Sequence, residues 1–115
     1  MTRSPFFTDT LFFYPAALTA TGTTSTFVVA DPADTSPNNF GFQVTVASIG
    51  TSVVVRFEGS LDGTNFFALA ASDTTISANG TTGYSFANFP LKAVRARLVT
   101  ISTGTPTVTF IMSAK

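Results

Sequence analysis

Apolar and polar side chains alternate through much of the chain after residue 26, and this two-residue period predicts β-strands. Residues 40–49 (FGFQVTVASI) place four large apolar side chains on one face: Phe40, Phe42, Val44 and Val46. Residues 52–59 (SVVVRFEG) do the same with Val53, Val55 and Phe57. In residues 91–102 (LKAVRARLVTIS), one face carries Val94, Ala96 and Leu98, opposite Arg95, Arg97 and Val99. We therefore expect three amphipathic strands with one buried face each.

Shorter segments with the same character predict further strands at residues 26–30, 65–71, 84–89 and 107–112. A polar loop at 31–39 carries two prolines, and a Thr-rich gap occupies residues 72–83. No apolar period of 3.6 residues persists over ten positions, so no helix is predicted. About seven or eight short strands in this length predict an all-β fold, an antiparallel β-sandwich or jelly roll, formed by residues 26–115.

The first 25 residues have a different pattern and predict an extended apolar N-terminal arm. Pro5, Asp9 and Pro15 interrupt the apolar clusters, which argues against a signal peptide or a membrane span. The arm either completes the core of its own domain or anchors the chain to a partner. We favour the partner, because a sandwich of residues 26–115 already has a core and exposed apolar patches are rare on monomers. The candidate partner-binding residues are Phe6, Phe7, Leu11, Phe12, Phe13 and Tyr14.

Composition limits the function. Only 10% of the residues are charged and the formal net charge is zero. That balance gives no electrostatic attraction to nucleic acid or to an anionic membrane, and it favours a surface covered in an assembly, such as a homo-oligomer. The chain has no Cys and no His, which removes thiol catalysis, the usual general base and the usual zinc ligands. We expect no enzyme activity, no catalytic residue, no metal and no cofactor.

The stretch EGSLDGTNFF at 58–67 is open to two interpretations. A calcium loop needs several oxygen ligands at alternating positions, whereas here Asp62 stands alone. A β-hairpin needs only an Asp-Gly pair between two apolar strands, and Asp62-Gly63 supplies it. We favour the hairpin and expect Phe66 or Phe67 to return to the core.

Charged residues on the predicted strands form a candidate ion-pair or ligand surface. Arg95 and Arg97 lie two residues apart, so they project from one face of their strand. The favoured interpretation is cross-strand pairing with Glu58 or Asp62. The alternative is capture of a phosphate or carboxylate by the arginine forks. The members of this surface are Arg56, Glu58, Asp62, Arg95 and Arg97.

The order of these motifs also resembles a known family. The run SVVVRFEGSLDGTNFFAL, followed after the Thr-rich gap by YSFANFPLKAVRARLVTISTGTPTVTF, resembles small β-sandwich modules of tailed-phage virion proteins. The likeness covers roughly residues 40–113. It is also similar in order to discoidin-type jelly rolls, although this chain has no Trp and no Cys.

The resemblance implies a structural protein of the virion, most like a capsid decoration (cement) protein that bridges major capsid subunits. It implies a homotrimer as the oligomer, other virion proteins as partners, and a place on the capsid surface after assembly in the host cytoplasm. Two alternatives stay open. One is a carbohydrate- or receptor-binding module of a tail fibre, with Phe66, Phe67 or Tyr84 as an aromatic platform. The other is a neck or tail accessory protein.

Overall fold

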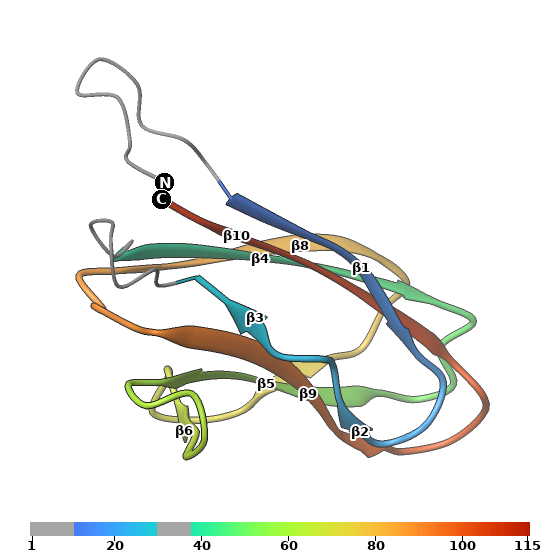
Figure 1. Ribbon diagram of the computed structural model, residues 1–115. Helices are drawn as coiled ribbons and strands as arrows, with labels where there is room; N and C mark the ends of the chain where they lie inside the picture. The colour runs from blue at the N-terminus through green and yellow to red at the C-terminus, as the bar shows by residue number, and fades with distance from the viewer. Residues whose placement is uncertain (1–10, 30–37) are drawn as a thin grey trace.

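Two antiparallel sheets packed face to face make up the computed structural model, which describes residues 11–29 and 38–115 (Figure 1). Sheet A has the order β1 (Leu11–Leu18), β10 (Thr107–Ala114), β4 (Asn39–Ala47) and β8 (Gly80–Ala87). Sheet B is centred on β9 (Ala93–Ile101) and β5 (Val53–Ser60). Its short edge strands are β2 (Gly22–Thr23) and β3 (Phe27–Val28) beside β9, and β6 (Phe67–Ala68) and β7 (Thr74–Ile76) beside β5. The predicted antiparallel sandwich is confirmed.

The core lies between the sheets and is built from the alternating positions of the long strands. The side chains predicted to face inward on β4 and β5 are buried, at 0–3% exposure, as are those predicted on β9. Phe42 on sheet A meets Phe57 on sheet B with ring centroids 4.6 Å apart. Each fully buried large side chain contributes roughly 1.5–3 kcal/mol. Burial of these faces therefore fixes the strand register, because a one-residue slip would turn every apolar side chain outward.

The predicted arm is described from residue 11 onward, and there it belongs to the sandwich. Strand β1 pairs antiparallel with β10, so that Leu11 lies opposite Ala114 and Leu18 opposite Val108. Its register shifts between Phe13 and Ala16. Phe13 packs on the core, 5.7 Å from the ring of Phe27. The arm as predicted therefore contributes an edge strand to its own domain, while residues 1–10 lie outside the described range.

The second half of the chain differs locally from the predicted strands. The strand expected at 65–71 is reduced to two residues in β6, and the Thr-rich gap at 72–83 holds β7 and the first half of β8. Strand β8 begins at Gly80, opposite Val46, and ends before Asn88, which has a positive φ of 64°. Thr is a good strand former, so the gap extends the sheets instead of interrupting them.

Candidate partner-binding surface

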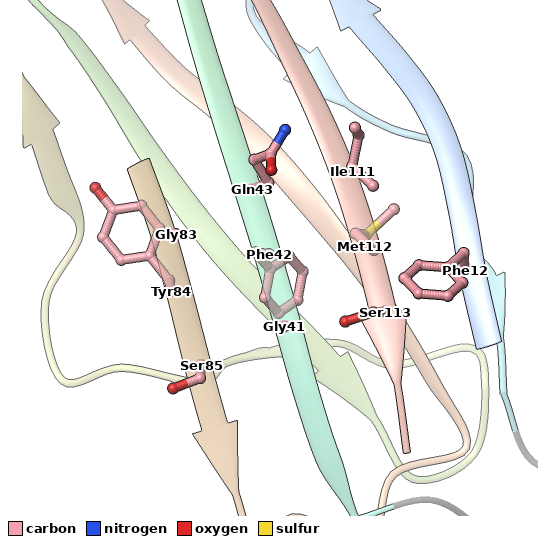
Figure 2. A pocket seen from close by; sticks show the side chains of 10 residues that line it. All are labelled: Phe12, Gly41, Phe42, Gln43, Gly83, Tyr84, Ser85, Ile111, Met112 and Ser113. Carbon is pink, nitrogen blue, oxygen red and sulfur yellow. The ribbon is translucent and has the colours of Figure 1, made fainter. Parts of the chain in front are cut away.

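A hollow of about 360 Å³ lies on the outer face of sheet A. Its floor is formed where two glycines replace outward side chains: Gly41 on β4 and Gly83 on β8. Its rim carries Phe12, Gln43, Ser85, Ile111 and Ser113, and Figure 2 shows these residues distributed over four neighbouring strands. The register creates this arrangement, because Gly83 lies opposite Gln43, and Gly41 lies between Ser85 and Ser113.

The two glycines differ in what surrounds them. A Cβ added to Gly41 would lie 2.7 Å from the Oγ of Ser113, so the side chain of Ser113 would have to rotate away to make room for it. A Cβ added to Gly83 would meet nothing within 4 Å. Gly83 therefore leaves real space on the surface. A side chain from another molecule, or one introduced by mutation, has room to enter it.

Phe12 forms one wall of the hollow and is 52% exposed. It lies opposite Ser113 on β10, whose side chain faces outward. Single exposed apolar residues are common on protein surfaces. Phe12 is a candidate anchor because of its place at the hollow, since aromatic side chains can carry much of the binding energy of an interface.

The structure separates the six candidate residues of the arm. Phe12 faces outward at the rim of the hollow, whereas Phe13 is half-buried and packs on the core. Phe13 thus fits the alternative in which the arm completes its own domain. Phe6 and Phe7 lie outside the described residues, as do the side chains of Leu11 and Tyr14. The hollow itself was not predicted, although Gly41 and Gly83 inside alternating segments were a usable signal, since glycine in a strand often marks a close approach.

A second candidate surface, on the outer face of sheet B, is an ion-pair cluster around Glu58. Its side chain is only 6% exposed and accepts hydrogen bonds from Nε of Arg95 (2.7 Å) and Nε of Arg97 (3.1 Å). An Nη of Arg56 lies 3.7 Å away. Burial alone would raise the pKa of Glu58, but the hydrogen bonds from Arg95 and Arg97 outweigh it and hold the pKa below its usual value. The predicted cross-strand pairing with Glu58 is present.

Asp73 completes this cluster, and Asp62 takes no part in it. Asp73 receives two hydrogen bonds from Arg56, at 2.7 and 2.9 Å, which lower the pKa of Asp73 and raise that of Arg56. No local sequence pattern indicated that Asp73 would join the cluster. It reaches Arg56 because β7 pairs with β5 directly after it. Three guanidinium groups and two carboxylates give the cluster a net charge of +1, so most of its charge is balanced inside the cluster.

The loop between β5 and β6 is a hairpin connection, as predicted, but not a two-residue turn. Residues 61–66 separate the strands. Ser60 Oγ accepts from the N–H of Gly63 (2.8 Å), and Asp62 accepts from the N–H groups of Thr64 and Asn65 (both 2.8 Å). These hydrogen bonds to its charged form lower the pKa of Asp62 strongly. Asp62 therefore organises its own loop.

Phe66, at the end of this loop, and Phe67, the first residue of β6, do not reach the core. Phe67 is 42% exposed, and Phe66 lies under Arg95, whose guanidinium carbon is 3.9 Å from the ring centroid. Leu69 is buried in their place. Tyr84 is on the other sheet, with its ring 4.9 Å from Phe57. The three aromatics expected to form one sugar-binding platform are thus not gathered on one surface.

The described part of the chain contains neither a cluster of metal-ligating residues nor a membrane-spanning helix. Within residues 11–29 and 38–115, no three His, Cys, Asp or Glu residues are close enough to hold a metal ion. Over the same residues, no helix has the length and apolar character needed to span a bilayer.

Comparison with known proteins gives structural likeness only. No protein-family model matches the chain, and no curated protein matches it. Among solved structures, it is similar to the SPBc2 prophage-derived protein YomS, with a TM-score of 0.57 and 18% identity over 96% of this chain and 99% of that one. A chain from the disulfide-linked pili of Bacillus endospore appendages gives a TM-score of 0.43 and 11% identity, over 91% and 85% of the two chains. At these identities the likeness to YomS shows the fold alone.

Proposed function

We propose that this chain is a structural protein of a tailed-phage virion, and more specifically a capsid decoration (cement) protein. The observation that carries this proposal is the outer face of sheet A, where exposed Phe12 stands beside the glycine-floored hollow. This face offers an apolar anchor and a preformed recess, which suit a static contact with a neighbouring subunit. In this role the protein bridges major capsid subunits on the outside of the shell and has no catalytic turnover.

The mechanism is mechanical. A shell filled with DNA is under outward pressure, and its weakest points are the seams between subunits. A small rigid sandwich that buries surface on both sides of a seam adds contact area that must be lost before the seam opens. The sandwich suits this task because its core is closed by two sheets and the strands of sheet A carry no charged residue, so docking through that face costs little desolvation of charged groups.

The structural comparison supports the broader part of this proposal. The fold is shared with a prophage-derived protein over nearly the whole length of both chains. This agrees with the sequence resemblance to phage virion modules over residues 40–113. The proposed partners are therefore the major capsid protein or other virion proteins, with the homotrimer remaining a prediction from the resemblance.

Locating the protein in the particle tests the proposal most directly. Particles purified from cells that carry the gene would be imaged by electron cryomicroscopy, and the copies per particle counted by quantitative mass spectrometry. We expect many copies at three-fold or six-fold positions on the shell. Copies confined to one vertex or to the tail would contradict the decoration role and indicate a neck, tail or fibre component. Absence from the particle would refute the virion role altogether.

The contact surface is tested by adding purified protein back to shells that lack it. Phe12→Ser removes the exposed anchor, and Gly83→Leu fills the hollow without meeting a neighbour within 4 Å of its Cβ. Both should lose shell binding while the fold persists. Val28→Ser is the matched control, because Val28 is 60% exposed but lies on sheet B. Equal binding by Phe12→Ser, Gly83→Leu and Val28→Ser would show that this face is not the contact surface.

The structure also changes how the arm should be tested. A deletion of residues 1–20 would remove β1 and uncover the edge of β10. It would confuse loss of the arm with loss of an edge strand. A deletion of residues 1–10 alone keeps all pairing between β1 and β10, and it is the variant to compare with the full chain for shell binding.

A further inference from the structure

One edge of the sandwich lacks the features that keep sheet edges from pairing. Strand β8 (GTTGYSFA) pairs with β4 through eight consecutive residue pairs, from Gly80 opposite Val46 to Ala87 opposite Asn39, without a register shift. It has no charged residue and no proline. No other strand of the described residues pairs with its second side. Such a strand presents a row of backbone N–H and C=O groups, which can accept another strand.

The other three edges are protected in ways that proteins commonly use. Strand β1 contains Pro15, which has no N–H to donate, and its pairing with β10 shifts register there. The two edges of sheet B consist of strands of two or three residues each, β2 and β3 on one side and β6 and β7 on the other. Only β8, among the described strands, is an edge that is long, regular and uncharged.

We propose that β8 pairs antiparallel with β8 of a second copy of this chain, about a two-fold axis. The two four-stranded sheets A would then form one continuous sheet of eight strands. A second copy is the occupant that the strand itself favours. Its length and twist match by identity, and its lack of charge means that no register places like charges opposite each other.

The side chains along β8 agree with this occupant. Thr81, Gly83 and Ser85 face outward and are exposed, so they would form a small, polar outer row across the junction. Tyr84 and Phe86 face the core side and are only half-buried at the sheet edge. A second β8 would cover their open side with the same two aromatics, and aromatic cross-strand pairs stabilise sheets. This inference rests on the edge of sheet A and is independent of the proposed virion role.

Sedimentation equilibrium of the purified full chain, over a wide concentration range, tests the pairing. We expect a reversible monomer–dimer equilibrium. The variant T81K/S85K adds two lysines to the outer row of each copy, which brings like charges together across the junction, and it should shift the mass to monomer. The variant T75K/T100K adds the same charge at two exposed positions on sheet B and should dimerise like the wild type. Circular dichroism confirms that each variant is folded.

Hydrogen exchange identifies the strand involved. In the dimer, the β8 amides that face away from β4 should become protected as the concentration rises, while the amides of β6 and β7 should not change. This measurement uses the wild type, so it decides the question even if T81K/S85K fails to fold. A wild-type chain that stays monomeric, a trimer, or a dimer without protection of β8 would each overturn the proposal. A trimer would instead support the oligomer implied by the family resemblance.

Discussion

Replacing Glu58 by Gln should destabilise the fold more than any other single change to a charged group in the described residues. The change keeps the shape of the side chain but removes the carboxylate that holds three arginines. Arg56 and Arg97 lie directly opposite each other on β5 and β9, and Glu58 lies opposite Arg95. Without the negative charge, the arginines repel one another, and the NH2 of Gln faces groups that can only donate.

The size of the effect follows from the contacts. Glu58 accepts two charged hydrogen bonds, at 2.7 and 3.1 Å. Hydrogen bonds to charged groups contribute about 1.5–3 kcal/mol each. Arg95 and Arg97 are 23% and 35% exposed, so water can replace part of the loss and the lower end applies. One amide oxygen still accepts one bond, so lost hydrogen bonding accounts for about 1.5 kcal/mol. Repulsion among the arginines adds to this, and the expected loss of unfolding free energy is about 2–3 kcal/mol.

Urea denaturation at neutral pH, monitored by circular dichroism, measures this loss. For a domain of this length the midpoint of thermal unfolding should fall by roughly 10 °C. Asp73→Asn is the control, because it also removes a carboxylate from the cluster but at a position that is 27% exposed. Its cost should be clearly smaller. If Asp73→Asn costs as much as Glu58→Gln, burial does not decide the strength of this cluster, and the reasoning fails.

Three further predictions concern sheet B and the loop after β5. Because the pKa of Glu58 is lower in the folded chain than its ordinary 4.5, its stabilisation is complete above that pH and is lost as the pH falls through the folded value. The free energy of unfolding, measured by urea titration at a series of acidic pH values, should therefore fall less steeply with decreasing pH for Glu58→Gln than for the wild type. Gly59→Ala should lower the free energy of unfolding by about 1–3 kcal/mol through overpacking, because its Cβ would lie 2.5 Å from a methyl of Leu91. Gly83→Ala is the control: its Cβ would enter open space, so urea titration should show a free energy of unfolding close to that of the wild type. Ser60→Ala should cost about 1 kcal/mol and speed amide exchange in the 61–65 loop, because buried Ser60 accepts two N–H groups there; unchanged exchange would contradict this role.

The sequence predicted the parts of the fold that depend on alternation. Phe42, Val44, Val55 and Leu98 face the core as expected, because burial of one face leaves the strand no other register. The sequence pattern did not predict β1. In this segment Pro15 and the consecutive aromatic residues that precede Pro15 hide the two-residue period. Local sequence pattern thus predicted the strands wherever one face of a strand is buried in the core and the other is exposed to solvent.

The candidate surfaces were less accessible from sequence because they depend on register between distant strands. Gly41 and Gly83 form one hollow only because β4 and β8 pair so that each glycine falls among small or polar neighbours. Asp73 joins Arg56 only because β7 returns along β5. The expectation that Phe66 or Phe67 enters the core was wrong. The Asp62 loop takes six residues, and Leu69 is the side chain that turns inward.

The pairing of Leu11 with Ala114 also has a kinetic consequence. It joins the two ends of the described chain, so β1 can add to the sheet only after β10, the last of the described strands in chain order, is in place. Closing a loop of nearly the whole chain is entropically costly and slow, and it exposes the edge of β10 until late in folding. A circular permutant that links the two ends would turn the same pairing into a local hairpin. The fold would be unchanged, while its slowest contact would become one of its fastest.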